Sequence, residues 1–337
     1  MKIKTDVHYQ NQLPKILQLK KKFPGYELLL IYDRKLKTLN NKWIESFKFT
    51  YPVTGGENLK DLNNFPQHTE RIIKKINSIS NRKLLIIAFG GGSVGDFAGF
   101  FASVYKRGVP IVQIPSTWLA AMDSAHGGKT ALNVEGFKNQ VGSFHYPDEI
   151  YVVKNLLKSN SEKILKQSYG EFAKTIMLSK NLYKKNETKI WNLLPQIIQV
   201  KYNYLTCDPF EKNGERQFLN LGHTVGHVFE SVHKLSHGEA VAQGLIFMLE
   251  WSLIKKYLSP FEYTKAKEIL EKRFKINKCK KKPISKSQFM KTLCKDKKTT
   301  KEGKIFFIFL KGLGKPFRSK VSGDEICKEA QRQGWVK

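Results

Sequence analysis

The stretch Lys83–Asp96, which reads KLLIIAFGGGSVGD, decides the fold. It begins with an apolar run of strand length, and a glycine turn and an apolar helical segment, FAGFFASVY, follow at once. Glu27–Tyr32 (ELLLIY) and Ile111–Pro115 (IVQIP) are further short apolar runs on either side of it. Strands that alternate with helices predict an α/β layer built on a largely parallel sheet.

The pattern changes after about residue 160, where long segments of helical period dominate. These segments cover 161–185, 188–205, 216–234, 238–258 and 261–273. We therefore predict two domains, an α/β domain over residues 1–158 and a mainly α-helical domain over residues 159–337. Within them we expect a helix over 66–79 capped by Thr69, and a late strand over Lys304–Leu310 in a hairpin.

Composition excludes several classes of protein. The chain has 337 residues, of which 41% are hydrophobic and 12% aromatic, so it can bury a core and is not a disordered chain. No run approaches the roughly 18 apolar residues of a membrane span, and the N-terminus lacks the apolar region of a signal peptide. The four scattered cysteines form no C-x-x-C pair. We expect a cytoplasmic protein without disulfides or a membrane partner.

The formal net charge of +30 raises the question of nucleic-acid binding. Only eight of the 59 basic residues are arginines, and the lysines are spread along the chain in pairs and triplets. Readout of bases favours arginine, because its guanidinium forms two hydrogen bonds at once. We favour a solvated, lysine-rich surface that attracts small anionic substrates, and we expect no nucleic-acid partner.

The glycine turn fits the pattern G-x-G-x-x-G at Gly90, Gly92 and Gly95, after a strand and before a helix. Glycines let backbone amides approach a pyrophosphate, and the helix N-terminus adds its positive dipole. A dinucleotide fold of the usual kind also places an acid about 20 residues further on. The first acid after Asp96 is Asp123, beyond the next strand, so the turn predicts a phosphate loop in an unusual arrangement.

Histidines cluster in one short segment. Four of the eight histidines of the chain lie in LNLGHTVGHVFESVHKLSHGEAV, and His223 and His227 are spaced i, i+4 on one helix face. His237 follows after a short break. A catalytic divalent ion needs about three protein ligands and one open position. The spacing predicts a metal site, but it leaves open which histidines bind and whether a carboxylate joins them.

Several basic residues are candidates for binding an anionic substrate. They are Arg107, Lys129, Lys138, Lys174, Lys201 and Arg216. Any one lysine in so basic a chain is by default a solvated charge. Lys129 in HGGKT and Lys138 in FKNQVGSF are the better candidates, because they lie among glycines and small polar residues, where loops meet ligands.

Taken together, these motifs resemble those of the 3-dehydroquinate synthases. The segment 90–144 is similar to that family's core signature, and ERQFLNLGHTVGHVFE with SHGEAV is similar to its metal-binding helix and loop. YGEFAK resembles its G-x-x-E-x-x-K segment, and DKKTTKEGKIFFIFLKGLG its C-terminal stretch. The resemblance runs from about residue 25 to 315.

The resemblance implies a dehydroquinate synthase-like fold, in which an N-terminal NAD-binding α/β domain and a mainly α-helical C-terminal metal-binding domain enclose the active site. It also implies a divalent metal, zinc or cobalt, and a homodimer. The implied metal ligands are Glu171, His223 and His237. The implied NAD contacts are Asp33, Glu57, Lys60, Gly91, Gly92, Ser93, Asp96, Ser116, Thr117, Asp123, Lys138 and Asn139. The implied catalytic and substrate contacts are His227, Lys129, Lys174, Lys201, Arg216, Asn220, Arg107 and Lys298, with Asn139 shared.

The implied substrate is a small anionic sugar phosphate, 3-deoxy-arabino-heptulosonate 7-phosphate. The implied reaction is transient oxidation by NAD, elimination of phosphate, re-reduction and intramolecular aldol closure to 3-dehydroquinate, a step of the shikimate pathway. Two alternatives use the same machinery: another sugar phosphate cyclase, such as a 2-deoxy-scyllo-inosose synthase, and a metal-dependent polyol dehydrogenase. A basic nucleic-acid-binding protein is the third reading, and it predicts steeply salt-dependent binding.

Overall fold

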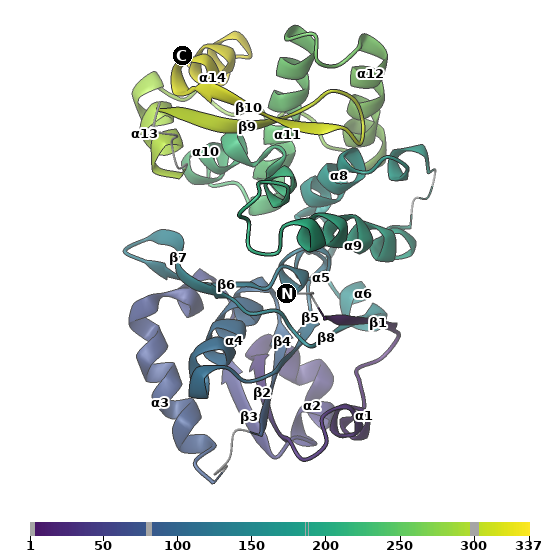
Figure 1. Ribbon diagram of the computed structural model, residues 1–337, viewed down its shortest axis with the longest axis vertical. Coiled ribbons are helices and arrows are strands. Elements are labelled where there is room, and N and C mark those ends of the chain that lie inside the picture. Colours follow the sequence, from purple (N-terminus) through teal and green to yellow (C-terminus); the bar gives the residue numbers. More distant parts are fainter. Residues whose placement is uncertain (1–3, 79–82, 186, 188, 297–302) are drawn as a thin grey trace. The chain divides into compact units, whose positions relative to one another are not determined.

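The computed structural model describes residues 4–78, 83–185, 187, 189–296 and 303–337. The chain divides into two compact units, Met1–Ile164 (unit 1) and Leu165–Lys337 (unit 2). Each unit has its own secondary structure (Figure 1). The sequence places the domain boundary at 158/159, within a few residues of this division.

Unit 1 is built on a six-stranded sheet in the order β1-β8-β5-β4-β2-β3, in which every neighbouring pair is parallel. The strands are β1 (Asp6–Gln10), β2 (Glu27–Asp33), β3 (Phe49–Val53), β4 (Leu84–Gly90), β5 (Ile111–Pro115) and β8 (Glu149–Val153). The central strand β4 is buried along its whole length, as its apolar run predicts. The α/β layer predicted from the sequence is confirmed.

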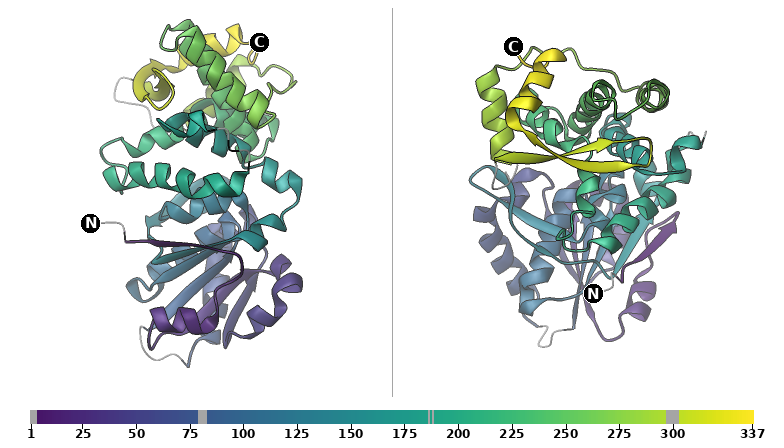
Figure 2. Two further views of the ribbon diagram at one scale, coloured as in Figure 1. Left: turned by 90° about the vertical axis from the view of Figure 1, so that its right-hand side faces the viewer. Right: turned by 45° about the horizontal axis from the view of Figure 1, so that its top comes forward.

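Helices cover both faces of this sheet (Figure 2). On one face, α3 (Phe65–Lys75) and α4 (Gly92–Val104) bury Ile72 and Phe97. On the other face, α1 (Ile16–Lys22) and α2 (Lys37–Glu45) contribute Leu19 and Ile44 to a second core. The remaining elements of the unit are α5 (Trp118–Met122), α6 (Lys154–Lys158) and the hairpin of β6 (Lys129–Val134) and β7 (Phe137–Phe144); α7 (Glu162–Lys166) crosses into unit 2.

Unit 2 is mainly helical, as the sequence predicts. Its helices are α8 (Tyr169–Leu178), α9 (Ile190–Cys207), α10 (His223–His233), α11 (His237–Ile254), α12 (Pro260–Glu268), α13 (Lys286–Asp296) and α14 (Gly323–Arg332). The predicted late strand is β9 (Lys304–Leu310), paired antiparallel with β10 (Pro316–Ser322). This hairpin packs on α11, and the rings of Trp251 and Phe307 meet edge to face.

The sequence misplaced several helix ends. Helix α3 begins at Phe65, with Pro66 in its first turn, so Thr69 lies inside the helix and does not cap it. The segment 216–234 divides into a 3-10 turn, Arg216–Asn220, and α10, because Gly222 adopts a left-handed conformation between them. No helix in the described part of the chain is long and apolar enough to span a membrane.

Candidate active site

The glycine turn joins β4 to α4 in unit 1. Gly91 is the extended N-cap residue of α4. A Cβ on Gly90 would lie 2.6 Å from Cβ of Val94, and one on Gly95 would lie 2.9 Å from Oε1 of Gln113. Two of the three motif glycines thus serve close packing of the helix against the sheet.

The first turn of α4 also has the properties of an anion site. Gly91 has no side chain to cap the helix, and its carbonyl accepts from the amides of Val94 and Gly95. Among the described residues, this leaves the amides of Gly92 and Ser93 for another acceptor. A helix N-terminus with free amides and a positive dipole binds phosphate groups well. The predicted phosphate loop is therefore compatible with the pyrophosphate of NAD.

The predicted NAD contacts gather at the carboxyl ends of the parallel strands of unit 1, where ligands bind in open α/β sheets. Asp33 ends β2, and its carboxylate accepts a hydrogen bond from the amide of Lys35. Ser116 and Thr117 follow β5, and Thr117 caps α5. The remaining contacts lie in the 3-10 turn Glu57–Lys60, the glycine turn with Ser93 and Asp96, the N-cap position Asp123, and strand β7 with Lys138 and Asn139.

A hydrogen-bonded network links these elements. The buried ammonium of Lys60 donates to Asp96 at 2.5 Å and to the side-chain oxygen of Asn139 at 2.6 Å. Asn133, which no sequence motif indicated, donates to Glu57 at 2.8 Å and accepts from the amide of Asn139 at 3.0 Å. Asn139 has a φ of +56°, so the bond from Asn133 holds it in a strained conformation.

Burial raises the pKa of Asp96, although the Lys60 ammonium opposes that rise. A carboxyl held by a single lysine in this setting retains one oxygen for a ligand hydroxyl. Through Lys60, the network thus holds two predicted NAD contacts together, Asp96 on helix α4 and Asn139 on the β6–β7 hairpin.

The substrate contacts predicted in unit 1 are not all brought to the glycine turn. Lys129 begins β6 and lines a small cavity together with Gly91, Gly92 and Asp96. Arg107 follows the far end of α4, which at 13 residues is about 20 Å long. Lys298, a predicted substrate contact from the later part of the chain, lies outside the described residues.

In unit 2, three predicted metal ligands converge from three different helices. Glu171 lies on α8, while His223 and His237 begin α10 and α11. Nε2 of His223 and Nε2 of His237 lie 3.2 and 3.5 Å from Oε1 of Glu171. One donor atom from each residue falls within 4.8 Å of the others.

Glycines explain why these helices come so close. A Cβ on Gly170 would lie 2.0 Å from the carbonyl oxygen of Gly238, and a Cβ on Gly238 would lie 1.6 Å from that of Gln167. No side chain fits at either position. Because Gly170 precedes Glu171 and Gly238 follows His237, this contact between α8 and α11 places the carboxylate beside the imidazole.

The ionisable side chains of the cluster shift one another's pKa values. Burial alone would raise the pKa of the Glu171 carboxyl, but Lys174, whose ammonium lies 2.5 Å away, and the two histidines hold that pKa well below its usual range. Burial and the Lys174 charge lower the pKa of His223 to about 4. Burial opposes protonation of His237, yet the nearby carboxylates of Glu171 and Glu230 raise its pKa to about 10.

This donor set fits a divalent ion. Among the described residues, neither oxygen of the buried Glu171 carboxylate has a hydrogen bond of acceptable direction. Nδ1 of His223 lies 3.2 Å from the carbonyl of Leu221, which leaves Nε2 as the metal-binding nitrogen. Two imidazoles and one carboxylate are a set that zinc and similar ions prefer.

Two further residues border the cluster. The ring of His227 lies 5.4 Å from that of His223 and 6.0 Å from that of His237. Glu230, one turn further along α10, accepts from Nδ1 of His237 at 3.0 Å. Sequence reasoning missed Glu230, although its i, i+3 spacing from His227 places both on one helix face.

The other predicted substrate contacts of unit 2 are buried or half-buried cations and an amide. Lys201 lies on α9, and Arg216 and Asn220 lie in the 3-10 turn before α10. Arg216 donates to the carbonyl of Pro209 at 2.6 Å. The buried Asp208 accepts from backbone amides of the following loop, including that of Arg216, and so fixes the approach to this turn.

The fold defines the class of the protein. A 2-deoxy-scyllo-inosose synthase complexed with carbaglucose-6-phosphate, NAD⁺ and Co²⁺ has a TM-score of 0.83 and 23% identity, covering 97% of this chain and 96% of that one. A 2-epi-5-epi-valiolone synthase of Streptomyces hygroscopicus with NAD⁺ and Zn²⁺ has a TM-score of 0.81 and 17% identity, covering 99% and 97%. The chain therefore has the fold of these two synthases.

Sequence comparisons give the family. Family models described as the N-terminal and C-terminal parts of 3-dehydroquinate synthase match residues 50–167 and 164–299. The 3-dehydroquinate synthase of Leptospira interrogans is 33% identical over 97% of this chain and 94% of its own length. That of Methylacidiphilum infernorum is 32% identical over 94% and 88%. The chain belongs to the 3-dehydroquinate synthase family, and the resemblance drawn from its motifs is confirmed.

Proposed function

We propose that this chain is a 3-dehydroquinate synthase, a lyase that converts 3-deoxy-arabino-heptulosonate 7-phosphate into 3-dehydroquinate and phosphate. The observation that carries the proposal is the convergence of Glu171, His223 and His237 from three helices in a chain of this family. The proposal extends to a cytoplasmic homodimer, as the family resemblance implies.

We assign the metal to Glu171, His223 and His237, and NAD to the carboxyl-end residues of unit 1. When bound, NAD supplies the transient oxidation of the C5 hydroxyl, and the divalent ion supplies Lewis-acid stabilisation of the charge on that oxygen. The ketone formed at C5 acidifies the neighbouring C–H bond, which makes loss of phosphate feasible. NAD is restored in each turnover, so the reaction has no net redox change.

The protein's own residues bind and orient the substrate. Lys174, Lys201 and Arg216 are buried cations, and such groups bind carboxylate and phosphate more strongly than exposed ones. His227 is within reach of the ligand histidines and is suited to orient a substrate hydroxyl or to move a proton. Glu230 holds His237 in one orientation, as a carboxylate behind a ligand histidine commonly does.

The test is to supply the heptulosonate phosphate with zinc or cobalt and a small amount of NAD, and to measure phosphate and NADH. The proposal predicts many equivalents of phosphate per NAD without accumulation of NADH. Accumulation of one NADH per substrate would support the polyol dehydrogenase instead. A hexose phosphate, which lacks the carboxylate of the heptulosonate phosphate, tests in parallel for the activity of the other cyclases, which share the fold with this chain.

A further inference from the structure

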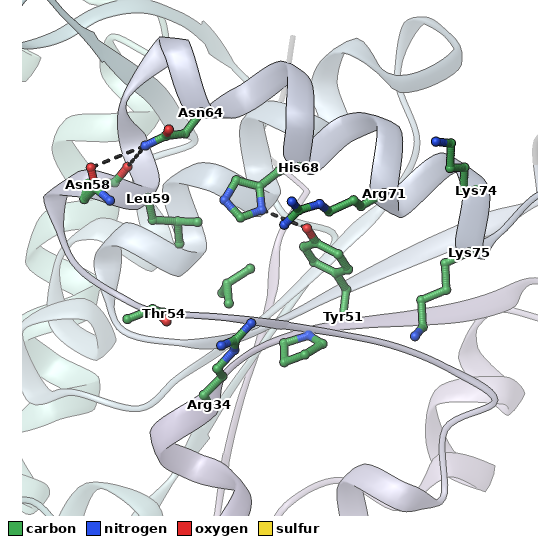
Figure 3. Close-up of a pocket in the computed structure, with 12 residues that line it drawn as sticks. Arg34, Tyr51, Thr54, Asn58, Leu59, Asn64, His68, Arg71, Lys74 and Lys75 are labelled. Carbon is green, nitrogen blue, oxygen red and sulfur yellow. Dashed lines mark hydrogen bonds between the residues drawn. The ribbon is translucent and has the colours of Figure 1, made fainter.

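A second cavity lies at the edge of the sheet in unit 1, beside strand β3. Its volume is about 760 Å³, a size typical of pockets for small molecules. Its walls come from the end of β3, the loop after β2 and one face of α3 (Figure 3). Neither the proposed NAD contacts nor the metal cluster is among its lining residues.

The cavity is lined by cations without carboxylates. Arg34, Arg71, Lys74 and Lys75 contribute to the lining, and none of its twelve residues is an Asp or Glu. In the described part of the chain, none of the four cations forms an ion pair with a carboxylate. Two of only eight arginines in the chain therefore face one hollow.

Two carboxylates close to the lining residues in sequence already accept hydrogen bonds. Asp33, which precedes Arg34, accepts from the amide of Lys35 at 3.1 Å. Glu57, at the start of the turn beside the cavity, accepts from Asn133 at 2.8 Å. Glu70 precedes Arg71 on α3 but is not among the lining residues, so the wall of the cavity itself carries only positive charge.

The base of the cavity is polar. The hydroxyl of the buried Tyr51 and Nδ1 of His68 lie 2.8 Å apart, beside the guanidinium of Arg71 (Figure 3). Burial lowers the pKa of His68, and the charges of Arg71 and Arg34 lower it further. The electrostatic effect of both guanidinium groups is therefore felt at the His68 imidazole. A neutral His68 and a Tyr hydroxyl offer hydrogen bonds to a ligand oxygen.

We propose that this cavity binds a small molecule that carries a phosphate group, held by Arg34 and Arg71 at a site separate from the NAD and metal sites. Guanidinium groups match phosphate with paired, charge-assisted hydrogen bonds, and lysines add charge without fixed geometry. The concave shape favours a compact ligand over the extended backbone of a nucleic acid.

The test measures binding of inorganic pyrophosphate by calorimetry at fixed ionic strength, with R34Q/R71Q as the variant. Loss of two charge-assisted contacts should lower the affinity for pyrophosphate at one class of sites by about tenfold or more. K20Q/K21Q, which removes two charges from exposed positions on α1, should leave that affinity within about twofold, because exposed distant charges are screened. R34K/R71K should give an intermediate affinity.

Lys174→Gln separates this site from the proposed substrate site: the binding lost in R34Q/R71Q should remain in this variant. Unchanged unfolding midpoints of the arginine variants establish that they fold. Equal weakening by K20Q/K21Q, displacement of the pyrophosphate by NAD, or no saturable binding would overturn the proposal. A short DNA duplex that binds through these arginines when pyrophosphate does not would assign the surface to nucleic acid and would also overturn it.

Discussion

Glu171 is the residue on which the helical site depends. It is a fully buried carboxylate, and Lys174, His223 and His237 surround it with positive charge or with nitrogen donors. A buried charge is tolerated only when it is paired or binds a metal. The histidine spacing predicted a metal site, because ligands on one helix face leave a local pattern. Glu171 was added only by the resemblance of YGEFAK to the family's G-x-x-E-x-x-K segment.

The residues that support the ligands left no such pattern. Glu230 orients His237, and Asn133 joins Glu57 to Asn139 across 76 and 6 positions of sequence. These contacts depend on how separate elements pack, so a single sequence does not reveal them.

Glu230→Gln should weaken metal binding by about 10- to 100-fold, because the neutral amide no longer supplies the negative charge that orients Nδ1–H of His237 and increases the basicity of its ring. Competition with a chromogenic chelator measures the change. Glu268→Gln, an equivalent substitution at an exposed pair with Lys272, should leave the affinity unchanged. Equal metal affinity in Glu230→Gln and the unaltered protein would refute the orienting role.

Asn133→Ala should weaken NAD binding by about tenfold while leaving metal binding unchanged, since it releases both Glu57 and the strained Asn139. Fluorescence titration with NAD measures the first quantity, and chelator competition the second. Asn133→Asp keeps the acceptor for Asn139 but repels Glu57, so we expect no recovery. A variant that binds NAD normally would show that the network is only structural.

At the scale of the element, the close contact between α8 and α11 creates the metal cluster. Gly170→Ala places a methyl group against the carbonyl of Gly238, and such overpacking costs about 1–3 kcal/mol of unfolding free energy. We expect a loss of metal affinity beyond the loss of stability, because the helices must separate. Gly303→Ala, where a Cβ meets nothing within 4 Å but φ is +70°, controls for backbone strain alone. Unimpaired metal binding in Gly170→Ala would refute this account.

The conformation of the loop after α9 depends on hydrogen bonds that its amides donate to the carboxylate of Asp208. Burial would raise the pKa of this carboxyl, but hydrogen bonds from the amides of Asn213, Lys212, Gly214 and Arg216 outweigh burial and lower it. A depressed pKa in the folded state stabilises the protein above the unfolded pKa of about 3.9, and this contribution is lost as the pH falls through the folded value.

Asp208→Asn should therefore reduce the unfolding free energy by about 1–3 kcal/mol at pH 7 and flatten its decline below about pH 4. Urea unfolding across the acid range measures both effects. A variant with the same pH profile as the unaltered protein would contradict the assignment.

The elements themselves could largely be predicted, because the period of apolar residues separates strands from helices and the glycine turn marks where one becomes the other. Helix starts were less accurate. Thr69 has a side chain suited to capping, but Pro66 begins the helix earlier, and a proline in the first turn is a competing signal. The packing of Gly170 on Gly238 joins helices about 70 residues apart and could not be predicted.

At the scale of the whole molecule, each unit carries one of the two proposed cofactor sites. Ligands that bind only the folded state raise its stability by mass action. Zinc should raise the unfolding midpoint of the unaltered protein but not of His223→Ala, whereas NAD should raise the midpoint of both. Differential scanning calorimetry of the metal-free proteins measures these shifts. A zinc-dependent rise of equal size in His223→Ala would place the metal elsewhere.

We propose that NAD oxidises the C5 hydroxyl of the heptulosonate phosphate with help from the divalent ion, and that the alcohol is later restored. The direct measurement uses the heptulosonate phosphate labelled with deuterium at C5, turned over with excess unlabelled NAD and zinc. We expect the product to keep the deuterium on the carbon that carried it, and no deuterated NADH to accumulate. Product without deuterium, or label that collects in NADH, would contradict it.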